Sequence, residues 1–154
     1  MPSLTPEQIE IVKCTWECVA KAPEDSGVAI LLRFFEKYSH NQKYFPFRNV
    51  PFDELKDNSM FRSHGGRVIA VFQKSVDALS TNDPMGTLQE IWTEIAKTHF
   101  RRHIKQESFN ELQEVILEIL TAACNLNEEQ QTAWTVTLAI IFEIIRKELD
   151  CLAE

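Results

Sequence analysis

Glycine and proline are scarce in this chain, with four glycines and six prolines among 154 residues. Because tight turns depend on these two residue types, their scarcity argues against a many-stranded β-fold. Long apolar runs are missing as well, since no stretch reaches eighteen apolar residues, and we expect no membrane-spanning segment. The composition that remains, 44% hydrophobic and 25% charged residues, is typical of one folded domain, which we assign to residues 1–154.

An excess of positive charge is also absent, because 23 acidic residues outnumber 16 basic ones and give a formal net charge of −7. A negative surface repels phosphate backbones and anionic lipids, so we expect neither nucleic acid nor a membrane as a partner. The N-terminal stretch MPSLTPEQIEIVK carries acidic and amide side chains where a secretory signal peptide needs an apolar run. We therefore expect a cytoplasmic protein.

Several motifs of enzymes and metal sites are missing. The sequence has no Glu-x-x-His pair of a di-iron bundle, no HExxH zinc motif, no phosphate-binding glycine loop and no GxSxG elbow. Its four cysteines form no CxxC pair, although two of them are spaced to share one helix face. We interpret all four as reduced thiols packed as small hydrophobic side chains: Cys14, Cys18, Cys124 and Cys151.

Capping signals and apolar residues at helical spacing predict an all-α protein of seven to eight helices. Thr5 caps the first helix, with Pro6 at its first position and Gln8 completing a capping box. Asn127 and Gln130 begin the last helix in the same way, and it runs to about residue 150. The other helices are expected from about 24 or 25, at about 52–55, at about 58–79, from 84, and at about 107–124.

Two histidines occupy positions that their helices otherwise reserve for apolar side chains. Ile91, Ile95 and His99 are spaced by four, so the imidazole of His99 projects with the isoleucines. It also lies at a helix end, where a ring nitrogen can donate to a free carbonyl of the preceding turn and so orient the ring for a metal. His64 falls between Phe61 and Val68 on another inward stripe.

A single histidine of this kind is more often a satisfied core residue than a ligand. Two of them, on separate helices and beside the aromatic corner Tyr44-Phe45-Pro46-Phe47, favour axial ligation of haem iron in an apolar pocket.

Three glycines lie inside expected helices, where each costs roughly 1 kcal/mol relative to alanine. We expect Gly27 and Gly65 to mark a close contact between two helices, the alternative being a simple kink; Gly66 is the third.

The pattern resembles the globin family over nearly the whole chain, and the intracellular haemoglobins of insects most closely. Trp16 stands at the position of the first-helix tryptophan, and Phe45, in KYFPF, at that of the corner phenylalanine. FRSHGGRVIAVF places His64 at the distal position, and IAKTHFRRH places His99 at the proximal position.

The resemblance implies a globin fold around haem b, with His99 as the proximal iron ligand and His64 facing the gas beside Leu31 and Val68. Phe45 would wedge against the haem, and Arg67 and His103 would contact the propionates. Arg101 and Arg102 are nearby candidates for that contact, although we interpret both as solvated surface residues. The apolar wall would include these residues: Leu31, Ile95, Phe109, Leu112 and Ile141.

Two features depart from the family pattern. Ser39 stands where globins commonly carry proline, so the start of the third helix is expected to be less rigid. The connection between Phe45 and His64 is also short, which affects the geometry of the corner but leaves the iron site intact.

The resemblance implies a binding protein rather than an enzyme, one that binds O2 reversibly for storage or facilitated diffusion, as a monomer or weak homodimer. An alternative is nitric oxide dioxygenation or redox or oxygen sensing, with His64 able to coordinate the iron. A third alternative is a helical interaction module without a cofactor.

Overall fold

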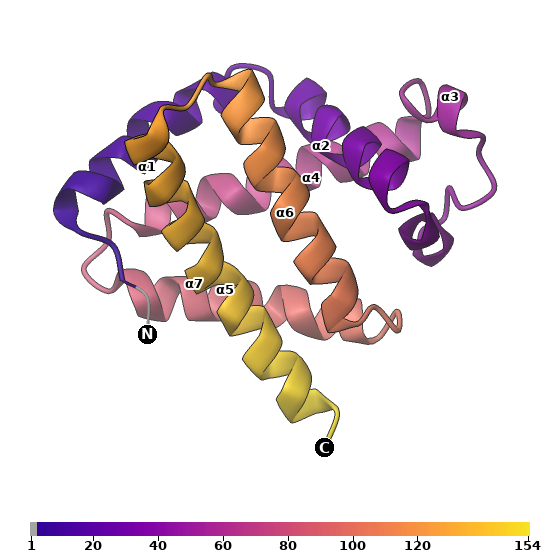
Figure 1. Cartoon of the computed structure of the whole chain (residues 1–154). Helices are drawn as coiled ribbons and strands as arrows, with labels where there is room; N and C mark the ends of the chain where they lie inside the picture. Colours follow the sequence, from indigo (N-terminus) through magenta and orange to yellow (C-terminus); the bar gives the residue numbers. More distant parts are fainter. Residues whose placement is uncertain (1–2) are drawn as a thin grey trace.

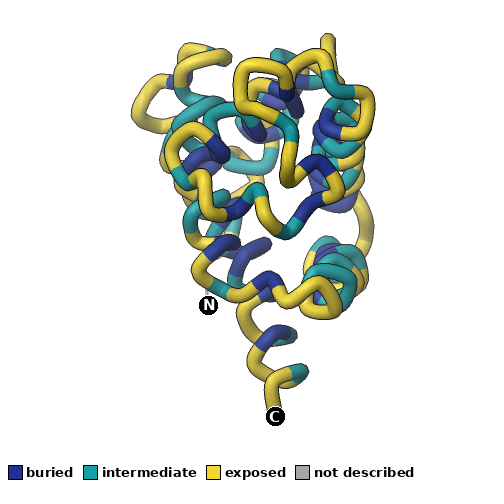
Figure 2. The backbone as a smooth tube through the Cα atoms, turned by 90° about the vertical axis from the view of Figure 1, so that its right-hand side faces the viewer, coloured by how far each residue is buried: buried dark blue, intermediate teal, exposed yellow. Residues whose placement is uncertain are grey.

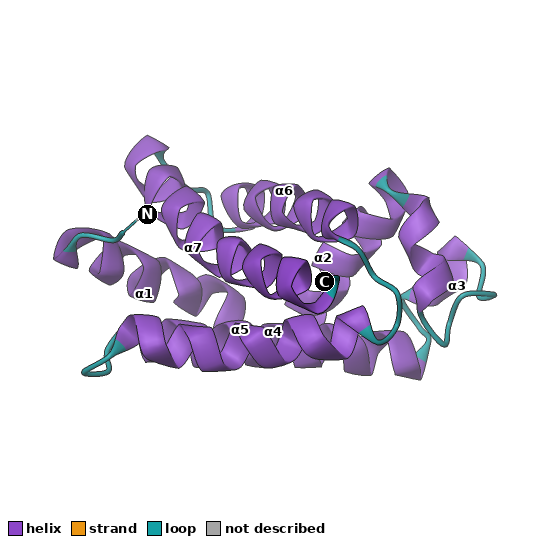
Figure 3. Ribbon diagram, turned by 90° about the horizontal axis from the view of Figure 1, so that it is seen from below, coloured by secondary structure: helices purple, strands orange, loops and turns teal. Residues whose placement is uncertain are grey.

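The computed structural model describes residues 3–154, which form an all-α fold. This range contains seven α-helices and one short 3₁₀ helix, and no strand (Figures 1 and 3). The prediction of seven to eight helices is therefore confirmed. The elements are α1 (Pro6–Ala20), α2 (Pro23–Lys37), η1 (Ser39–Tyr44), α3 (Phe52–Leu55), α4 (Ser59–Ala78), α5 (Pro84–Phe100), α6 (Gln106–Ala123) and α7 (Glu128–Leu152). Across residues 3–154, every helix is too short or too polar to cross a lipid bilayer.

The helix starts follow from local capping chemistry. The side chain of Thr5 accepts from the backbone N–H of Gln8, whose own side chain accepts from Thr5, and Asn127 and Gln130 repeat this arrangement in α7. The start expected at residue 24 or 25 is wrong by one or two residues, because α2 begins at Pro23. A proline suits the first helical position, and here the preceding residue makes no side-chain cap.

The helices pack in crossed pairs around one core. The most extensive contact joins α2 to α4, and α7 packs against both α5 and α6. Figure 1 shows α6 and α7 side by side, with the last turns of α7 extending away from the body of the molecule. In Figure 2 the buried residues lie along the inward sides of the helices, while the connecting segments are mostly exposed.

A phenylalanine corner, made of Phe35, Phe45, Phe47 and Phe61, joins α2 and α4 to the segment after η1. Phe45 and Phe47 stack with their ring centroids 5.1 Å apart, and the edge of Phe61 meets Phe47 at 5.4 Å. All four rings are buried, so burial of apolar area fixes the path of this otherwise irregular segment.

A tryptophan row crosses the other half of the core, through α1, α4, α5 and α7. Trp16 lies 5.9 Å from Trp134 and 6.3 Å from Phe72, which in turn lies 5.1 Å from Trp92, measured between ring centroids. Each indole N–H has an acceptor: Gln73 for Trp16, Ser75 for Trp92 and Thr15 for Trp134. The row therefore buries large apolar surfaces without leaving a donor unpaired.

All four cysteines are free thiols, but only two are packed as expected. Cys18 and Cys124 are half-buried, and the Cys18 thiol lies 3.5 Å from the carbonyl oxygen of Ala123. Cys14 and Cys151 are exposed, so the expectation that all four pack as hydrophobic side chains is wrong for these two.

Candidate functional site

A partly open cavity of about 340 Å³ lies between the helices, within the size range of small-molecule sites. Its walls come from α2, α4, α5, α6 and α7, and from the segment that carries Phe45. Nine of the residues singled out from the sequence line it: Leu31, Phe45, His64, Arg67, Val68, Ile95, His99, Phe109 and Leu112. Most of this surface is hydrocarbon, so a large apolar molecule with a few polar groups suits it best.

His99 lies in the last turn of α5 with one ring nitrogen occupied. Its Nδ1 lies 2.7 Å from the carbonyl oxygen of Ile95, one turn earlier, and 3.3 Å from the hydroxyl of Thr98. A carbonyl oxygen only accepts, so Nδ1 must carry the proton and donate it. The hydrogen bond expected at this helix end is therefore present, and it leaves Nε2 with a free lone pair.

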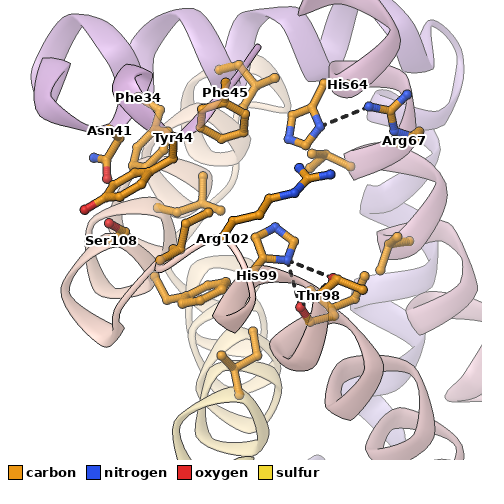
Figure 4. A pocket seen from close by; sticks show the side chains of 18 of the residues that line it. Phe34, Asn41, Tyr44, Phe45, His64, Arg67, Thr98, His99, Arg102 and Ser108 are labelled. Atoms are coloured by element: carbon orange, nitrogen blue, oxygen red, sulfur yellow. Dashed lines mark hydrogen bonds between the residues drawn. The ribbon is translucent and has the colours of Figure 1, made fainter. Parts of the chain in front are cut away.

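His64 projects from α4 toward the same space (Figure 4). Its ring packs edge-on against Phe45, with centroids 5.1 Å apart, which limits how far the imidazole can rotate. Its Nδ1 lies 3.4 Å from a guanidinium nitrogen of Arg67. A guanidinium only donates, so in this contact Nδ1 accepts and the proton of the neutral ring resides on Nε2.

The two imidazoles therefore differ in what their Nε2 atoms offer. His99 offers a lone pair, which is what a metal ligand needs, whereas His64 offers an N–H, which is what a hydrogen-bond donor needs.

Burial keeps both rings neutral. Burial first, and the nearby Arg67, His99 and Arg102 in smaller measure, together lower the pKa of His64 to about 4. Burial is also the main cause of the lowered pKa of His99, which the hydrogen bond to Ile95 partly opposes. A neutral imidazole at neutral pH is the form that binds a metal.

Two residues predicted to touch the cofactor do not line the cavity. Ile141 is completely buried in the core, and the next residue in α7, Phe142, lines the cavity instead, because one residue turns a helix by about 100°. His103 adopts a left-handed conformation with φ of 65° beyond the end of α5 and is exposed. The cavity is reached by Ile104 instead.

Several cavity residues were missed by the sequence analysis. Arg102, a nearby candidate that was interpreted as a solvated surface residue, is exposed as expected, but it also lines the cavity, with its side chain between the two imidazoles in Figure 4. Asn41 and Ser108 are buried polar residues of the wall, and the Oδ1 atom of Asn41 has no hydrogen-bond partner. Asn41 lies in the short η1 helix and Ser108 in the first turn of α6, so the spacing of apolar residues did not single out either of them.

The family model described as Globin matches residues 28–145, which is more than half of the chain. This chain belongs to the globin family. The predicted fold class and the family resemblance are thereby confirmed.

Insect globins are among the solved structures to which this globin is similar. A Drosophila melanogaster protein described as a hexa-coordinate hemoglobin is 42% identical, with a TM-score of 0.90 over 92% of this chain and 93% of that chain. The hemoglobin of the botfly Gasterophilus intestinalis is 33% identical, with a TM-score of 0.87 over 96% and 99% of the two chains. Cytoglobin-1 of Danio rerio is 32% identical over 146 residues, which cover 91% of this globin and 82% of that protein.

Globins bind haem in a pocket of this kind, and the cavity fits that group. The walls are mostly apolar, one imidazole presents a lone pair, and Arg67 and Arg102 are cationic residues of the same wall, of the type that pairs with carboxylates.

Proposed function

We propose that this globin holds haem b through Nε2 of His99 and binds O2 reversibly, for storage or facilitated diffusion inside cells. The observation that carries the proposal is the opposite placement of the protons on the two imidazoles. Haem, when bound, supplies an iron centre that binds diatomic gases. The protein supplies one nitrogen ligand on one side of the cavity and one N–H donor on the other.

On the gas side, three side chains act together. The N–H at Nε2 of His64 would donate a hydrogen bond to bound O2, and a donor forms a stronger hydrogen bond to a partner that carries negative charge. Leu31 and Val68 line the same space and exclude water, which disfavours the charge separation that would oxidise the site.

On the cofactor side, the apolar wall holds the macrocycle and the arginines hold its carboxylates. Phe45, Ile95, Phe109 and Leu112 line the cavity and would hold the macrocycle through apolar contacts. Arg67 and Arg102 line it as well and would pair with the propionates. Ring contact between His99 and Phe109, with centroids 5.4 Å apart, fixes the plane of the iron ligand.

We also propose that the protein acts in the cytoplasm as a monomer or weak homodimer and has no enzymatic turnover. Its net charge of −7 supports the absence of nucleic-acid and membrane partners.

A second candidate has His64 itself coordinating the iron, in a protein that senses oxygen or redox state or converts nitric oxide. It is supported by the description of the Drosophila protein as hexa-coordinate. Coordination through Nε2 requires the proton to move to Nδ1, and the contact of Nδ1 with Arg67 is then lost.

The absorption spectrum of the ferrous, gas-free protein distinguishes the two candidates first. A single broad visible band supports the first candidate, whereas two sharp bands mean that both histidines are bound to iron.

Gas kinetics provide the sharper test. A hydrogen bond to a charged partner contributes about 1.5–3 kcal/mol, so His64→Leu should raise the O2 dissociation rate by roughly ten- to a hundredfold and change that of carbon monoxide little. His103→Leu, at an exposed histidine outside the cavity, is the matched control. If His64→Leu instead leaves O2 dissociation unchanged and speeds the association of both gases, His64 competes for the iron and the first candidate is wrong.

A further inference from the structure

A second group of ligand-type side chains lies outside the haem cavity, where η1 meets the start of α6. It consists of His40, Glu107 and Glu111, each of which places one potential ligand atom within 4.8 Å of the other two. Nε2 of His40 lies 2.9 Å from a carboxylate oxygen of Glu111. Glu107 and Glu111 are four residues apart on α6 and therefore share one face of that helix.

The two glutamates of this group have no lysine or arginine partner in the described residues, unlike two glutamates further along α6. Further along the helix, Glu114 pairs with Lys37 and Glu118 pairs with Arg33, at 3.0 Å and 2.9 Å. Over residues 3–154, the ion pairs include none from a lysine or arginine to Glu107 or Glu111. Two like charges on one helix face repel each other, and a divalent cation between them would remove that repulsion.

His40 does not supply this charge by itself, because its imidazole is charged only when it is protonated. The Glu111 side chain is only 14% exposed, so water compensates its charge less well than it does for the glutamates further along α6.

A buried side chain of η1, Asn41, also holds the carboxylate of Glu111 in place. The side-chain amide of Asn41 is almost completely buried and donates to a Glu111 oxygen at 3.1 Å and to the carbonyl oxygen of Tyr38 at 3.1 Å. A buried amide that orients a carboxylate ligand is the kind of supporting contact that tunes metal sites.

We propose that His40, Glu107 and Glu111 bind a zinc ion, with a fourth position open to water. Zinc accepts one imidazole nitrogen and carboxylate oxygens in a tetrahedral arrangement at about 2.0–2.2 Å, which places the ligand atoms roughly 3.3 Å apart. The pair His40 and Glu111 is already near that separation. Because a carboxylate only accepts, Nε2 of His40 donates in this contact, so zinc binding at Nε2 requires the proton of the neutral ring to move to Nδ1. The ligand atom of Glu107 lies within 4.8 Å of the other two and would move closer to complete the set. The imidazole disfavours calcium and magnesium, which take oxygen ligands.

The ion would tie η1 to α6 beside the cavity, because Asn41 contacts Glu111 on one side and lines the cavity on the other. Zinc should therefore raise the melting temperature of the protein as well as bind to it.

The test is a calorimetric titration of the haem-loaded protein with zinc chloride at neutral pH, after alkylation of the exposed thiols of Cys14 and Cys151, which could also bind zinc. We expect one site of micromolar or tighter Kd. His40→Ala and Glu111→Gln should each raise Kd at least tenfold and abolish the rise in melting temperature, while Glu107→Gln should raise Kd severalfold.

Two matched controls keep the result specific. His103→Ala removes an exposed histidine and Glu90→Gln an exposed glutamate, both outside the group, and both should bind zinc as the wild type does. Zinc binding that is absent, or that survives His40→Ala unchanged, would overturn the proposal. An anomalous diffraction peak between the three side chains in zinc-soaked crystals would establish the ligands directly, whereas a peak elsewhere would refute them.

Discussion

The carbonyl oxygen of Gly65 lies 2.0 Å from the place where a β-carbon on Gly27 would stand. In the reverse direction, a β-carbon on Gly65 would lie 2.9 Å from the carbonyl carbon of Gly27. Helices α2 and α4 therefore touch backbone to backbone at this crossing. The close contact expected from the sequence is confirmed, and it brings His64, one residue before Gly65, toward the cavity.

Gly65→Ala should destabilise the fold by about 1–3 kcal/mol, because the added methyl group pushes apart two backbones rather than two flexible side chains. The neighbouring Gly66 has no atom within 4 Å of its own β-carbon position, so Gly66→Ala is the matched control. We expect Gly66→Ala to be neutral or to stabilise α4 by up to about 1 kcal/mol through helix propensity. Chemical denaturation followed by circular dichroism measures both; similar free energies for the two variants would contradict the backbone contact.

His99→Ala should greatly weaken haem retention. On the inward face of α5 the residues one and two turns earlier are Ile95 and Ile91, which carry no ligand atom. The rate of haem loss to a haem-scavenging protein measures the effect, and His103→Ala, at the exposed corner, should lose haem at the wild-type rate. Wild-type retention and an unchanged spectrum in His99→Ala would show that the proposed iron ligand is wrong.

The helical fold was predictable because its signals are local. A capping box such as Thr5 with Gln8 needs only four residues, and apolar spacing identifies the buried face of each helix. The start of α2 was missed because Ala22 offers no capping side chain. The path of the phenylalanine corner was not predictable in detail, since it depends on how rings from α2 and α4 pack together.

The position of His64 and His99 at the cavity could be predicted, because one helix face decides it. The position of Ile141 could not, because several faces of α7 are buried and only the neighbouring helices decide which one meets the cavity. His103 does not line the cavity, and spacing cannot reveal the left-handed turn after α5 in which it lies. Arg102 is exposed and also lines the cavity, a combination that residue spacing does not reveal.

The haem-free protein should lose stability as the pH falls, in part because of His64. Its pKa in the folded chain is about 4, chiefly because of burial, whereas an unfolded histidine has a pKa of about 6.5. Between these pH values the unfolded state binds more protons than the folded state, so the free energy of unfolding falls as the pH is lowered. Below about pH 4 His64 causes no further loss.

Between pH 7 and pH 5 the contribution of His64 amounts to about 2 kcal/mol. Equilibrium unfolding of the haem-free protein at both pH values should therefore show a steeper loss for the wild type than for His64→Gln. His103→Gln should follow the wild type. Parallel losses in the wild type and His64→Gln would mean that His64 becomes protonated in the folded chain as easily as in the unfolded chain.

The four thiols should differ in their reactivity. Burial, and in smaller measure the neighbouring Cys18 thiol, raises the pKa of Cys124 to about 12, so very little of its reactive thiolate exists near neutral pH. Cys14 and Cys151 are exposed. Iodoacetamide labelling followed by mass spectrometry of the peptides should find those two modified long before Cys124. In denaturant the difference should disappear, and equal rates in the native protein would contradict the packing of Cys124.

All three tryptophans of the chain belong to the tryptophan row, and none lies between residues 17 and 91. Intrinsic fluorescence therefore reports on the junction of α1, α4, α5 and α7, while the phenylalanine corner that supports His64 contributes no tryptophan emission. An unfolding transition followed by this emission would miss any earlier opening of the gas side. Amide hydrogen exchange in α2, η1 and the first half of α4 is the observable that would detect such a motion.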